Sequence, residues 1–554
     1  MRMSALPRTA ATAVDGRTRR RRRRRIAPDP TTTAALMRRA WPWVGAALVG
    51  LAVLVGSGLL LADRLTPRAS GAPSHALPPQ PAQTSIDREL APLLADQPGK
   101  TGVLLLADGL DAFAARALAT RKAGRSLDLQ YYMWHDDLTG RLLAREVHAA
   151  AERGVRVRLL LDDLNAEGLD PQLMALDAHP RIELRLYNPF RNREGVMRLL
   201  EMVQRVFSMT HRMHNKAWIV DGRVAIVGGR NIGEEYFSAD AEVNFRDLDL
   251  LLFGPAVQQA STIFDAYWNS AAAVPIDALN HQRPARLRSL LARADGEAAH
   301  AAAQPYLARV AKSQGVRAYF MQALAPHWTS RLEIVADPPM KGRDGGNHGG
   351  LTRRLLDTLG TTRHEALLIS PYFVPGDATT AGLVVLVERG ARVAVATNSL
   401  AANDVPAVHG GYARYRGTLL DGGVRLYEMK ARGHAAPTGR FGSSGASLHT
   451  KAFVVDDARG FVGSYNLDPR SANLNTEMGV LFDDRAIAAD VQAEYLRLTG
   501  PALSYWVSRD RDGELRWLDR ASSPVATLEH EPDTSRGQRA VAWLLAWLPI
   551  ESQL

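Results

Sequence analysis

Residues 214–231 read HNKAWIVDGRVAIVGGRN, and residues 448–466 read LHTKAFVVDDARGFVGSYN. Both stretches contain the pattern H-x-K-x4-D-x6-G-x2-N, and a gap-free match at five positions marks a duplicated chemical unit. Two imidazoles, two ammonium groups and two carboxamides are suited to hold a phosphodiester and exchange one of its ester oxygens. The matched positions share one constant offset along the chain and are His214, Lys216, Asp221, Gly228 and Asn231 with His449, Lys451, Asp456, Gly463 and Asn466.

The segments before each motif repeat one order of elements. In the first half, the apolar run 126–134 precedes a helical stretch at 140–153 and strand patterns at 155–161 and 182–187. In the second half the same order is found at 366–374, 380–388, 393–397 and 424–427. Strands that alternate with helices predict an α/β fold, with a mixed or mostly parallel sheet covered by helices in each half. The Ala-rich and charged residues 270–314 are predicted to form a helical connection.

The two motifs are expected to meet in one site. His214 and Lys216 lie two residues apart, so on a strand they project to one face, and the second motif repeats this spacing. Asn231 and Asn466 follow Gly-rich turns whose N–H groups can face a phosphate. Packing of the halves about a pseudo-twofold axis would therefore bring both motifs to one phosphorus atom.

The expected chemistry is attack by one neutral imidazole while the other, protonated, donates to the departing alkoxide. The candidate catalytic residues are His214, Lys216, Asp221, His449, Lys451 and Asp456. Within this set, Asp221 and Asp456 are expected to brace strand ends or ion pairs rather than transfer protons. Glu477 is the candidate acceptor that orients the attacking histidine, and Asp249 is its counterpart after the first motif. No metal or cofactor is predicted, because H-x-K places a cation beside any histidine ligand.

Composition and charge limit the alternatives. The 554 residues allow two or three domains. The chain has no cysteine, which excludes disulfides, zinc thiolate sites and cysteine nucleophiles. The net charge of +10 originates in residues 1–68, which hold 14 arginines and three aspartates. The remainder carries 54 basic and 55 acidic residues, so it does not have the basic surface that nucleic-acid binding requires.

The N-terminal region predicts a membrane anchor. An unbroken arginine run at 19–25 precedes 22 residues without a charge, 41–62, a length sufficient to cross a bilayer as a helix. Basic residues before the helix predict a cytoplasmic N-terminus and an exterior catalytic part. A cleavable signal peptide is the alternative, since residues 69–72 (ASGA) resemble a cleavage site. The expected order is a basic tail (1–40), transmembrane helix (41–62), linker (63–86), first lobe (87–314) and second lobe (315–554).

The paired motif resembles that of the phospholipase D superfamily, and the resemblance narrows to the bacterial cardiolipin synthases. Supporting stretches are QYYMWHDDLTGRLL (130–143), ISPYFVPG (369–376), TNSLAANDVPAVHGGYARYR (397–416) and GSYNLDPRSANLNTEMG (463–479). The resemblance implies two similar lobes, metal-independent chemistry and a phosphohistidine intermediate, with His214 as nucleophile and His449 as acid. It implies phospholipid substrates, with Asn231, Asn466 and Ser464 as substrate-binding residues. The first copy departs from the family pattern, with Gly229 in place of the serine that follows the turn glycine.

The function that this resemblance implies is transfer of a phosphatidyl group to phosphatidylglycerol, by an enzyme of the bacterial inner membrane whose catalytic part faces the periplasm or exterior. Hydrolysis of phospholipids by the same residues is the nearest alternative, followed by a nuclease and a non-catalytic membrane scaffold. Two amphipathic segments, 196–207 and 536–548, are candidates for membrane contact, although packing on the core explains them equally well.

Overall fold

A computed structural model describes residues 71–80, 83–166, 168–190, 210–279, 297–342, 350–431, 447–547 and 551–553, with isolated positions at 43–58 and 192–202. The basic tail, most of the predicted transmembrane helix and most of 196–207 lie outside the described residues. Among the residues that are described, no helix combines the length and apolar composition of a membrane span. Residues Pro67–Leu554 form one compact unit, separate from Met1–Thr66.

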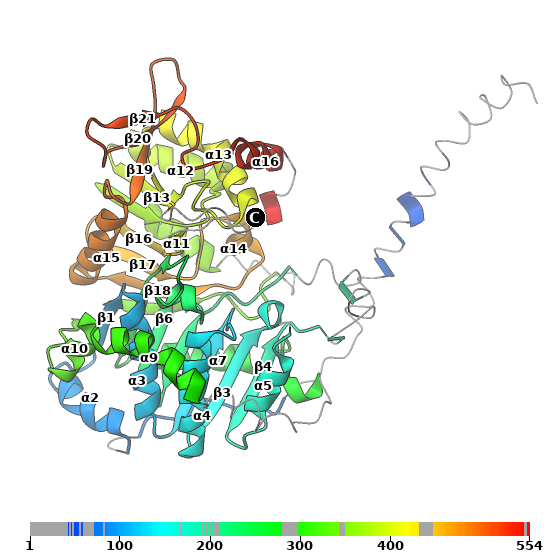
Figure 1. Cartoon of the computed structure of the whole chain (residues 1–554), viewed down its shortest axis with the longest axis vertical. Helices are drawn as coiled ribbons and strands as arrows, with labels where there is room; N and C mark the ends of the chain where they lie inside the picture. The colour runs from blue at the N-terminus through cyan, green and yellow to red at the C-terminus, as the bar shows by residue number, and fades with distance from the viewer. Residues whose placement is uncertain are drawn as a thin grey trace, which may run out of the picture. The chain divides into compact units, whose positions relative to one another are not determined.

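The first lobe is built on a nine-stranded mixed sheet (Figure 1). Its strand order is β10-β1-β8-β6-β5-β2-β3-β4-β9, and β2, β3 and β4 are parallel. The strands are β1 (Thr101–Leu106), β2 (Ser126–Tyr131), β3 (Arg156–Asp162), β4 (Ile182–Tyr187), β5 (Ala217–Val220), β6 (Val224–Gly228), β8 (Asp249–Phe253), β9 (Ala273–Pro275) and β10 (His327–Thr329). The helices are α2 (Ser85–Ala95), α3 (Gly109–Lys122), α4 (Leu138–Glu152), α5 (Asp170–Asp177), α7 (Ala256–Trp268), α9 (Glu297–Ala311) and α10 (Gln314–Phe320), with 3-10 turns η1 (Asp163–Asn165), η2 (Glu234–Tyr236) and η3 (Ile276–Ala278).

The second lobe repeats this plan in a ten-stranded sheet of order β11-β18-β17-β16-β12-β13-β14-β19-β20-β21. The strands are β11 (Leu332–Ala336), β12 (Glu365–Ile369), β13 (Arg392–Asn398), β14 (Arg425–Met429), β16 (Lys451–Val455), β17 (Arg459–Gly463), β18 (Met478–Asp483), β19 (Ser504–Arg509), β20 (Leu515–Asp519) and β21 (Ala526–Leu528). The helices are α11 (Gly350–Gly360), α12 (Gly376–Glu388), α13 (Pro406–Asp421), α14 (Pro469–Asn473), α15 (Arg485–Leu498) and α16 (Arg536–Ala546), followed by η5 (Glu551–Gln553).

The duplication seen in the motifs extends to the sheets. Both contain the same central order, β1-β8-β6-β5-β2-β3-β4 and β11-β18-β17-β16-β12-β13-β14. The motif strands β5 and β16 lie in the middle, each between an antiparallel hairpin partner and the first strand of a parallel trio. The predicted α/β fold with two similar mixed sheets is therefore confirmed.

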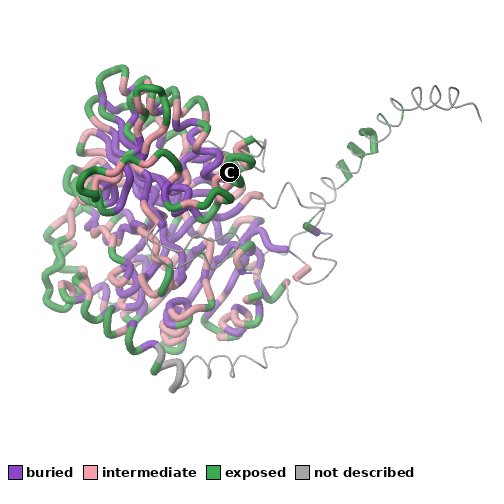
Figure 2. The backbone as a smooth tube through the Cα atoms, turned by 45° about the horizontal axis from the view of Figure 1, so that its top comes forward, coloured by how far each residue is buried: buried purple, intermediate pink, exposed green. Residues whose placement is uncertain are grey.

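One hydrophobic core joins the lobes. Along β5, Ala217 and Ile219 pack in a cluster that also contains Ala452 and Val454 of β16, together with side chains of α7 and α15. The alternate residues Trp218 and Val220 enter a separate cluster on the other face of the first sheet. Both faces of each motif strand are thus buried, which explains the continuous apolar runs after each H-x-K. Figure 2 shows the buried residues concentrated in the interior of both lobes.

The structure shifts two predicted boundaries. Part of the predicted linker 63–86 lies along the first lobe, where the N–H groups of Ser74 and Ala76 donate to the side chains of Asn269 and Asp265. At the other boundary, β10 still pairs with β1 of the first sheet, although it follows the predicted lobe limit at residue 314. The chain enters the second sheet at Leu332.

Candidate active site

Each motif histidine is fixed by the backbone of the opposite lobe. The N–H group of His214 donates to the carbonyl of Thr476 over 2.9 Å, and that of His449 donates to the carbonyl of Arg246 over 2.8 Å. The short strand β7 (Phe245–Arg246) pairs in parallel with β15 (Ser447–Leu448), directly before His449. A parallel bridge between Met213 and Thr476 does the same before His214. These backbone contacts between the lobes are reciprocal, so the position of each histidine depends on both lobes.

Each imidazole also contacts a carboxylate that belongs to the opposite lobe. Nδ1 of His214 lies 2.8 Å from Oε2 of Glu477, and Nδ1 of His449 lies 2.6 Å from Oδ2 of Asp247. Both carboxylates are fully buried. An ionised carboxylate at Nδ1 requires a proton there, which makes Nε2 the lone-pair end of each neutral ring. The contact predicted between Glu477 and the attacking histidine is present in the structure.

The prediction that Asp249 is the corresponding partner of His449 is wrong. The Asp249 carboxylate accepts from Arg116 over 2.9 Å and lies 3.3 Å from a guanidinium nitrogen of Arg230. All three side chains are buried, and together they form an internal cluster of one carboxylate and two guanidinium groups at the start of β8. Asp247 precedes that strand and directly follows β7, and this position carries its side chain to the opposite lobe.

The motif lysines lie beside the histidines. Nζ of Lys216 donates to the carbonyl of His214 over 2.6 Å, and Nζ of Lys451 donates to the carbonyl of His449. Both lysines are about 1% exposed, a burial that ordinary surface lysines do not have. The two ammonium groups are therefore held in place before any ligand arrives.

Aromatic rings that the sequence reasoning missed enclose the imidazoles. The Tyr132 ring meets His214 edge to face at a centroid distance of 5.1 Å, and Nζ of Lys216 lies 5.4 Å from the centre of the same ring. Phe245 stacks on His449 at 5.3 Å, and Tyr236 meets it edge to face at 5.1 Å. The only signal in the sequence was the aromatic run at 131–134, whose apolar character predicted a strand.

The two motif asparagines have amide ends that remain unused. Nδ2 of Asn231 donates to the Tyr236 hydroxyl over 2.8 Å. Oδ1 of Asn231 and Oδ1 of Asn466 are buried and have no hydrogen-bond partner within the described part of the chain. A buried amide without a partner is costly unless a ligand completes it. Because the two ends of an amide exchange by a half turn, either asparagine can present N–H to an anion.

Asp221 and Asp456 do not belong with the catalytic residues. The Asp221 carboxylate accepts from the backbone N–H groups of residues 124–126, where β2 begins. The Asp456 carboxylate accepts from those of residues 363–365, where β12 begins. Both residues adopt a positive φ, 53° and 50°, at the turn that follows the motif strand. Each lies at the far end of that strand from its histidine, so the two aspartates brace strand ends, as the sequence reasoning expected, and their inclusion in the catalytic set is corrected.

Burial makes the site unfavourable for positive charge. Burial lowers the pKa of His214 to about 4, and the ammonium groups of Lys216 and Lys451 add to that effect while Glu477 opposes it. Burial also lowers the pKa of His449 well below its usual value, with further contributions from Lys451, Lys216 and His214. Burial lowers the pKa of Lys451 to about 8. Groups from both lobes therefore interact electrostatically within one site, and burial favours the neutral form of both imidazoles.

Comparison with known proteins identifies this arrangement. The family model described as "Cardiolipin synthase, PLD-like domain" matches residues 119–268 and 355–499, one match in each lobe. Cardiolipin synthase C of Escherichia coli (strain K12) is 40% identical over 465 residues, 83% of this chain and 98% of the relative. The chain belongs to the cardiolipin synthase family of the phospholipase D superfamily. It is an enzyme of the phospholipase D type, a phosphatidyltransferase.

Two further similarities agree with this family. An uncharacterized protein of Helicobacter pylori (strain J99) is 34% identical over 457 residues, 82% of this chain and 90% of the relative. The crystal structure of phosphatidylserine synthase from Haemophilus influenzae Rd KW20 covers 84% of this chain and 99% of its own, with a TM-score of 0.54 and 14% identity. At that identity the structural match supports the two-lobed fold alone.

The Gly229 departure from the family pattern has a structural reason. A Cβ atom at Gly229 would lie 2.8 Å from Cγ of Asp247, so this position must be glycine if the Asp247 carboxylate is to reach His449. In the second lobe, Ser464 stands at the corresponding position, and its hydroxyl donates to Oε2 of Glu477 over 2.5 Å. Ser464 therefore supports the carboxylate, which corrects its predicted role as a direct substrate ligand.

We expect Gly229→Ser to reduce turnover about 100-fold, because the added side chain displaces the Asp247 carboxylate and misplacing a catalytic group by about 1 Å has that effect. Ser464→Gly is the matched control in the other lobe. It removes one donor to Glu477, leaves Ser471 as a second donor (3.0 Å) and is expected to cost about tenfold or less. Steady-state rates of the two purified variants test whether Gly229→Ser loses more turnover than Ser464→Gly, and equal losses would contradict this expectation.

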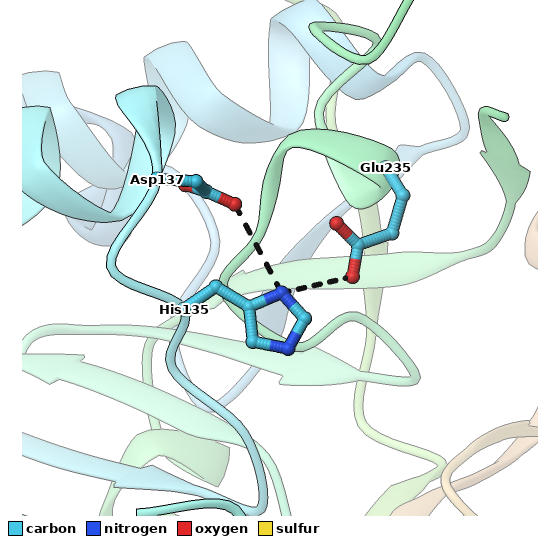
Figure 3. A group of neighbouring side chains, drawn as sticks. All are labelled: His135, Asp137 and Glu235. Carbon is cyan, nitrogen blue, oxygen red and sulfur yellow. Dashed lines mark ion pairs between the residues drawn. The ribbon is translucent and has the colours of Figure 1, made fainter. Parts of the chain in front are cut away.

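One further cluster has the composition of a metal site. Nδ1 of His135 lies 3.3 Å from Glu235 and 3.9 Å from Asp137 (Figure 3). Asp137 already accepts from the N–H groups of Gly140 and Glu234, over 2.8 and 2.7 Å, as the N-cap of α4. The contact with Glu235 raises the pKa of His135, which favours the protonated ring that cannot bind a metal. The cluster therefore fixes the start of α4 against η2.

Proposed function

We propose that this enzyme transfers a phosphatidyl group from a donor phospholipid to the glycerol hydroxyl of phosphatidylglycerol, which yields cardiolipin. The observation that carries the proposal is the reciprocal pair of buried contacts, His214 with Glu477 and His449 with Asp247. Two oriented imidazoles within one site are suited to two successive displacements at phosphorus. The name of the Escherichia coli relative and the family description support a phospholipid as substrate.

In the first step, Nε2 of His214 attacks the phosphorus atom of the donor. Glu477 holds the proton on Nδ1 and stabilises the positive charge that develops on the ring. The bond to the head-group oxygen breaks, and the proton on Nε2 of His449 passes to that oxygen. A phosphatidyl group remains on His214, and His449 is left neutral.

In the second step, the neutral His449 removes the proton from the acceptor hydroxyl. That oxygen attacks the phosphorus atom, the bond to Nε2 of His214 breaks, and cardiolipin leaves. Lys216 and Lys451 neutralise the non-bridging oxygens as negative charge builds, and the amides of Asn231 and Asn466 add directed hydrogen bonds. The unpartnered amide ends of these asparagines support such a role.

The charges of the site explain how His449 becomes an acid although its pKa is low. Among the motif lysines and the two carboxylates that contact the imidazoles, Asp247 and Glu477, the formal charges cancel. A bound phosphodiester adds one negative charge, which favours the protonation of one imidazole. Substrate binding is therefore proposed to take up one proton, and His449 is proposed to receive it.

We expect the affinity for dimethyl phosphate, a diester that remains a monoanion, to fall by up to about tenfold for each unit of pH increase between pH 6 and 8. The sign follows from the low pKa of free His449, since the ring is neutral before binding and protonated after it. Calorimetry in buffers with different ionisation enthalpies measures the uptake directly. His449→Gln should remove the pH slope between pH 6 and 7, where Lys451, whose pKa burial lowers to about 8, stays protonated. A pH-independent affinity of the unchanged protein in this range would contradict the proposed protonation.

The proposed activity is tested by incubating the full-length protein, reconstituted in vesicles, with phosphatidylglycerol and separating the lipid products. Cardiolipin and glycerol in equal amounts are expected. Phosphatidic acid without cardiolipin would establish water as the acceptor and replace the proposal with hydrolysis. A nuclease activity is disfavoured by the near-neutral charge of residues 69–554.

We also propose that residues 41–62 anchor the enzyme in a bacterial inner membrane, with the N-terminus in the cytoplasm and both lobes outside. The charge-free length of this segment and the arginines before it support that orientation. Proteolysis of intact spheroplasts should cleave both lobes if the proposal is right. Protection of the lobes until the membrane is opened would reverse the orientation.

A further inference from the structure

Helix α16 lies on the surface of the second lobe and is held there by a close contact. Its N-terminus has a capping box formed by Ser535 and Gln538. Ala542 is its one buried residue, and it packs on α13 where a Cβ atom at Gly410 would lie 2.9 Å from the Ala542 carbonyl oxygen. The glycine allows the two helices to approach closely. One face of α16 is therefore fixed to the protein, and the orientation of the opposite face is fixed with it.

The opposite face is apolar and exposed. The side chains of Trp543, Leu544 and Trp547 are 62%, 59% and 74% exposed, and the two indole rings contact each other at a centroid distance of 5.9 Å. Exposed Arg536 lies about two to three helical turns before them. A helix that gathers tryptophan and leucine on its outer face, with a basic residue near its start, has the composition of an interfacial membrane helix. Figure 2 shows exposed backbone in this region beside the C-terminus.

The chain after α16 leads to the wall of the active site. In η5, Glu551 accepts from Arg414 over 2.7 Å and also from the Tyr415 hydroxyl. Arg470 of α14 donates to the carbonyl of Gln553. Figure 1 places α16 and the C-terminus next to α13 and α14. The helix α14 begins three residues after Asn466 and contains Ser471, which contacts Glu477, so this end of the chain borders the site.

We propose that α16 docks on the surface of the phospholipid bilayer, with Trp543, Leu544 and Trp547 inserted at the boundary between head groups and acyl chains. The inference rests on the proposed function, because it gives a reason for an exposed apolar helix beside a site that must receive a lipid phosphate. Docking places the α14 side of the site against the head groups. A diester can then enter without leaving the bilayer completely.

The absence of cysteine allows a test with the full-length protein. Trp547→Cys is labelled with a polarity-sensitive fluorophore and reconstituted in vesicles of phosphatidylethanolamine and phosphatidylglycerol, part of which carry a spin label on the acyl chain. Leu496→Cys on α15, at a position 60% exposed, is the matched control. Emission at position 547 should be quenched at least about twofold, and emission at position 496 should be unaffected. Equal emission changes at both positions, or none at 547, would overturn the proposal.

A second measurement separates the lipid surface from other occupants of this face. If a second copy of the chain covers α16, the label at position 547 will become more accessible to aqueous iodide when the protein is diluted at constant detergent concentration, and the proposal fails. Shielding by detergent alone does not depend on the protein concentration. The quenching measurements need no turnover, so their outcome is independent of whether the product is cardiolipin or phosphatidic acid.

The catalytic consequence is tested with the double variant Trp543→Ala and Trp547→Ala. Its turnover of phosphatidylglycerol in vesicles should fall about tenfold. Its turnover of a short-chain phosphatidylglycerol below the micellar concentration should equal that of the unchanged protein, because neither tryptophan contacts the described catalytic groups. A matched loss on both substrates would indicate a structural defect and overturn the proposed docking role.

Discussion

His214→Gln should reduce phosphatidyl transfer by about 10⁴-fold or more, the loss expected when a covalent nucleophile is removed. The glutamine amide retains a polar group near Glu477 but has no lone pair of comparable nucleophilicity at the position of Nε2. The variant should also fail to form a covalent adduct. The measurement uses phosphatidylglycerol labelled with ³²P in its phosphate group, followed by denaturation and detection of acid-labile label on the protein.

His449→Gln should reduce turnover of natural phospholipids to a similar extent, but for a different reason. Its loss leaves the departing alkoxide without a proton donor, whereas His214 keeps its nucleophilic nitrogen and its contact with Glu477. A donor with a p-nitrophenol head group does not need that proton. With this donor, His449→Gln should release a burst of about one equivalent of p-nitrophenol and accumulate the phosphohistidine.

His327→Gln is the control for both variants. His327 contacts Asp490 over 2.8 Å, is partly exposed and lies on β10, so its loss should leave turnover within about twofold. If the burst and the adduct appear in His214→Gln and not in His449→Gln, the two roles are reversed. If neither variant loses activity, the proposed chemistry is wrong.

The sequence was sufficient for the fold and for the core of the site because the chain is duplicated. The constant offset between the two motifs aligned the strands β5 and β16, and the segments before them gave the bounds of β2, β3 and β4 approximately. His214 and His449 each interact electrostatically with Lys216 and Lys451, so the four residues lie near one another, and their joint catalytic role stays a prediction. Continuous apolar runs determine such strands locally, and local determinants are visible in a sequence.

The partners of the histidines depend on contacts between lobes, which a pattern does not display. Subtracting the constant offset between the motifs from Glu477 gives Glu242, which is exposed. The offset does not select Asp247 because the segment from Asn231 to Asp247 is longer than the segment from Asn466 to Glu477. Asp247 and Asp249 have the same parity, so strand periodicity could not choose between them. The choice is made by the pairing of β7 with β15, which brings together segments from opposite halves of the chain.

The aromatic rings were missed for a related reason. Tyr132, Tyr236 and Phe245 come from three separate segments. Tyr132 meets His214 within the first lobe, whereas Tyr236 and Phe245 meet His449 only after the lobes have packed. Each of these residues is also an ordinary core residue by composition. Gly229 was noted as a departure from the pattern, but its cause, the carboxylate of Asp247, belongs to a later segment of the chain and becomes evident only in three dimensions.

Asp247→Asn should reduce turnover by about 10³–10⁴-fold, comparable to the loss when a catalytic histidine is held in the wrong tautomer. Oδ1 of Asp247 accepts the N–H group of Leu248 over 2.8 Å, which would keep the amide oxygen of the variant at that position. The amide nitrogen then faces Nδ1 of His449 and donates to it. The proton of the neutral ring moves to Nε2, so His449 can no longer act as a base for the acceptor hydroxyl.

Glu477→Gln should have a smaller effect, about 10–100-fold. The Glu477 carboxylate accepts from two hydroxyl groups, those of Ser464 and Ser471, and hydroxyls can rotate to suit an amide in either orientation. The variant can therefore keep an oxygen toward Nδ1 of His214 and preserve the tautomer, while it loses the negative charge that stabilises the developing phosphohistidine.

The kinetic step distinguishes the two carboxylates. Asp247→Asn should retain the p-nitrophenol burst and then stall, because attack by His214 does not require a base at His449 and the acceptor step does. Glu477→Gln should slow the burst itself. Glu242→Gln is the matched control for Asp247→Asn, because Glu242 is the residue that the offset between the motifs selects. This variant should leave both the p-nitrophenol burst and the later acceptor step unchanged. Loss of the burst in Asp247→Asn would mean that this carboxylate acts before the phosphohistidine forms, contrary to the contacts that assign it to His449.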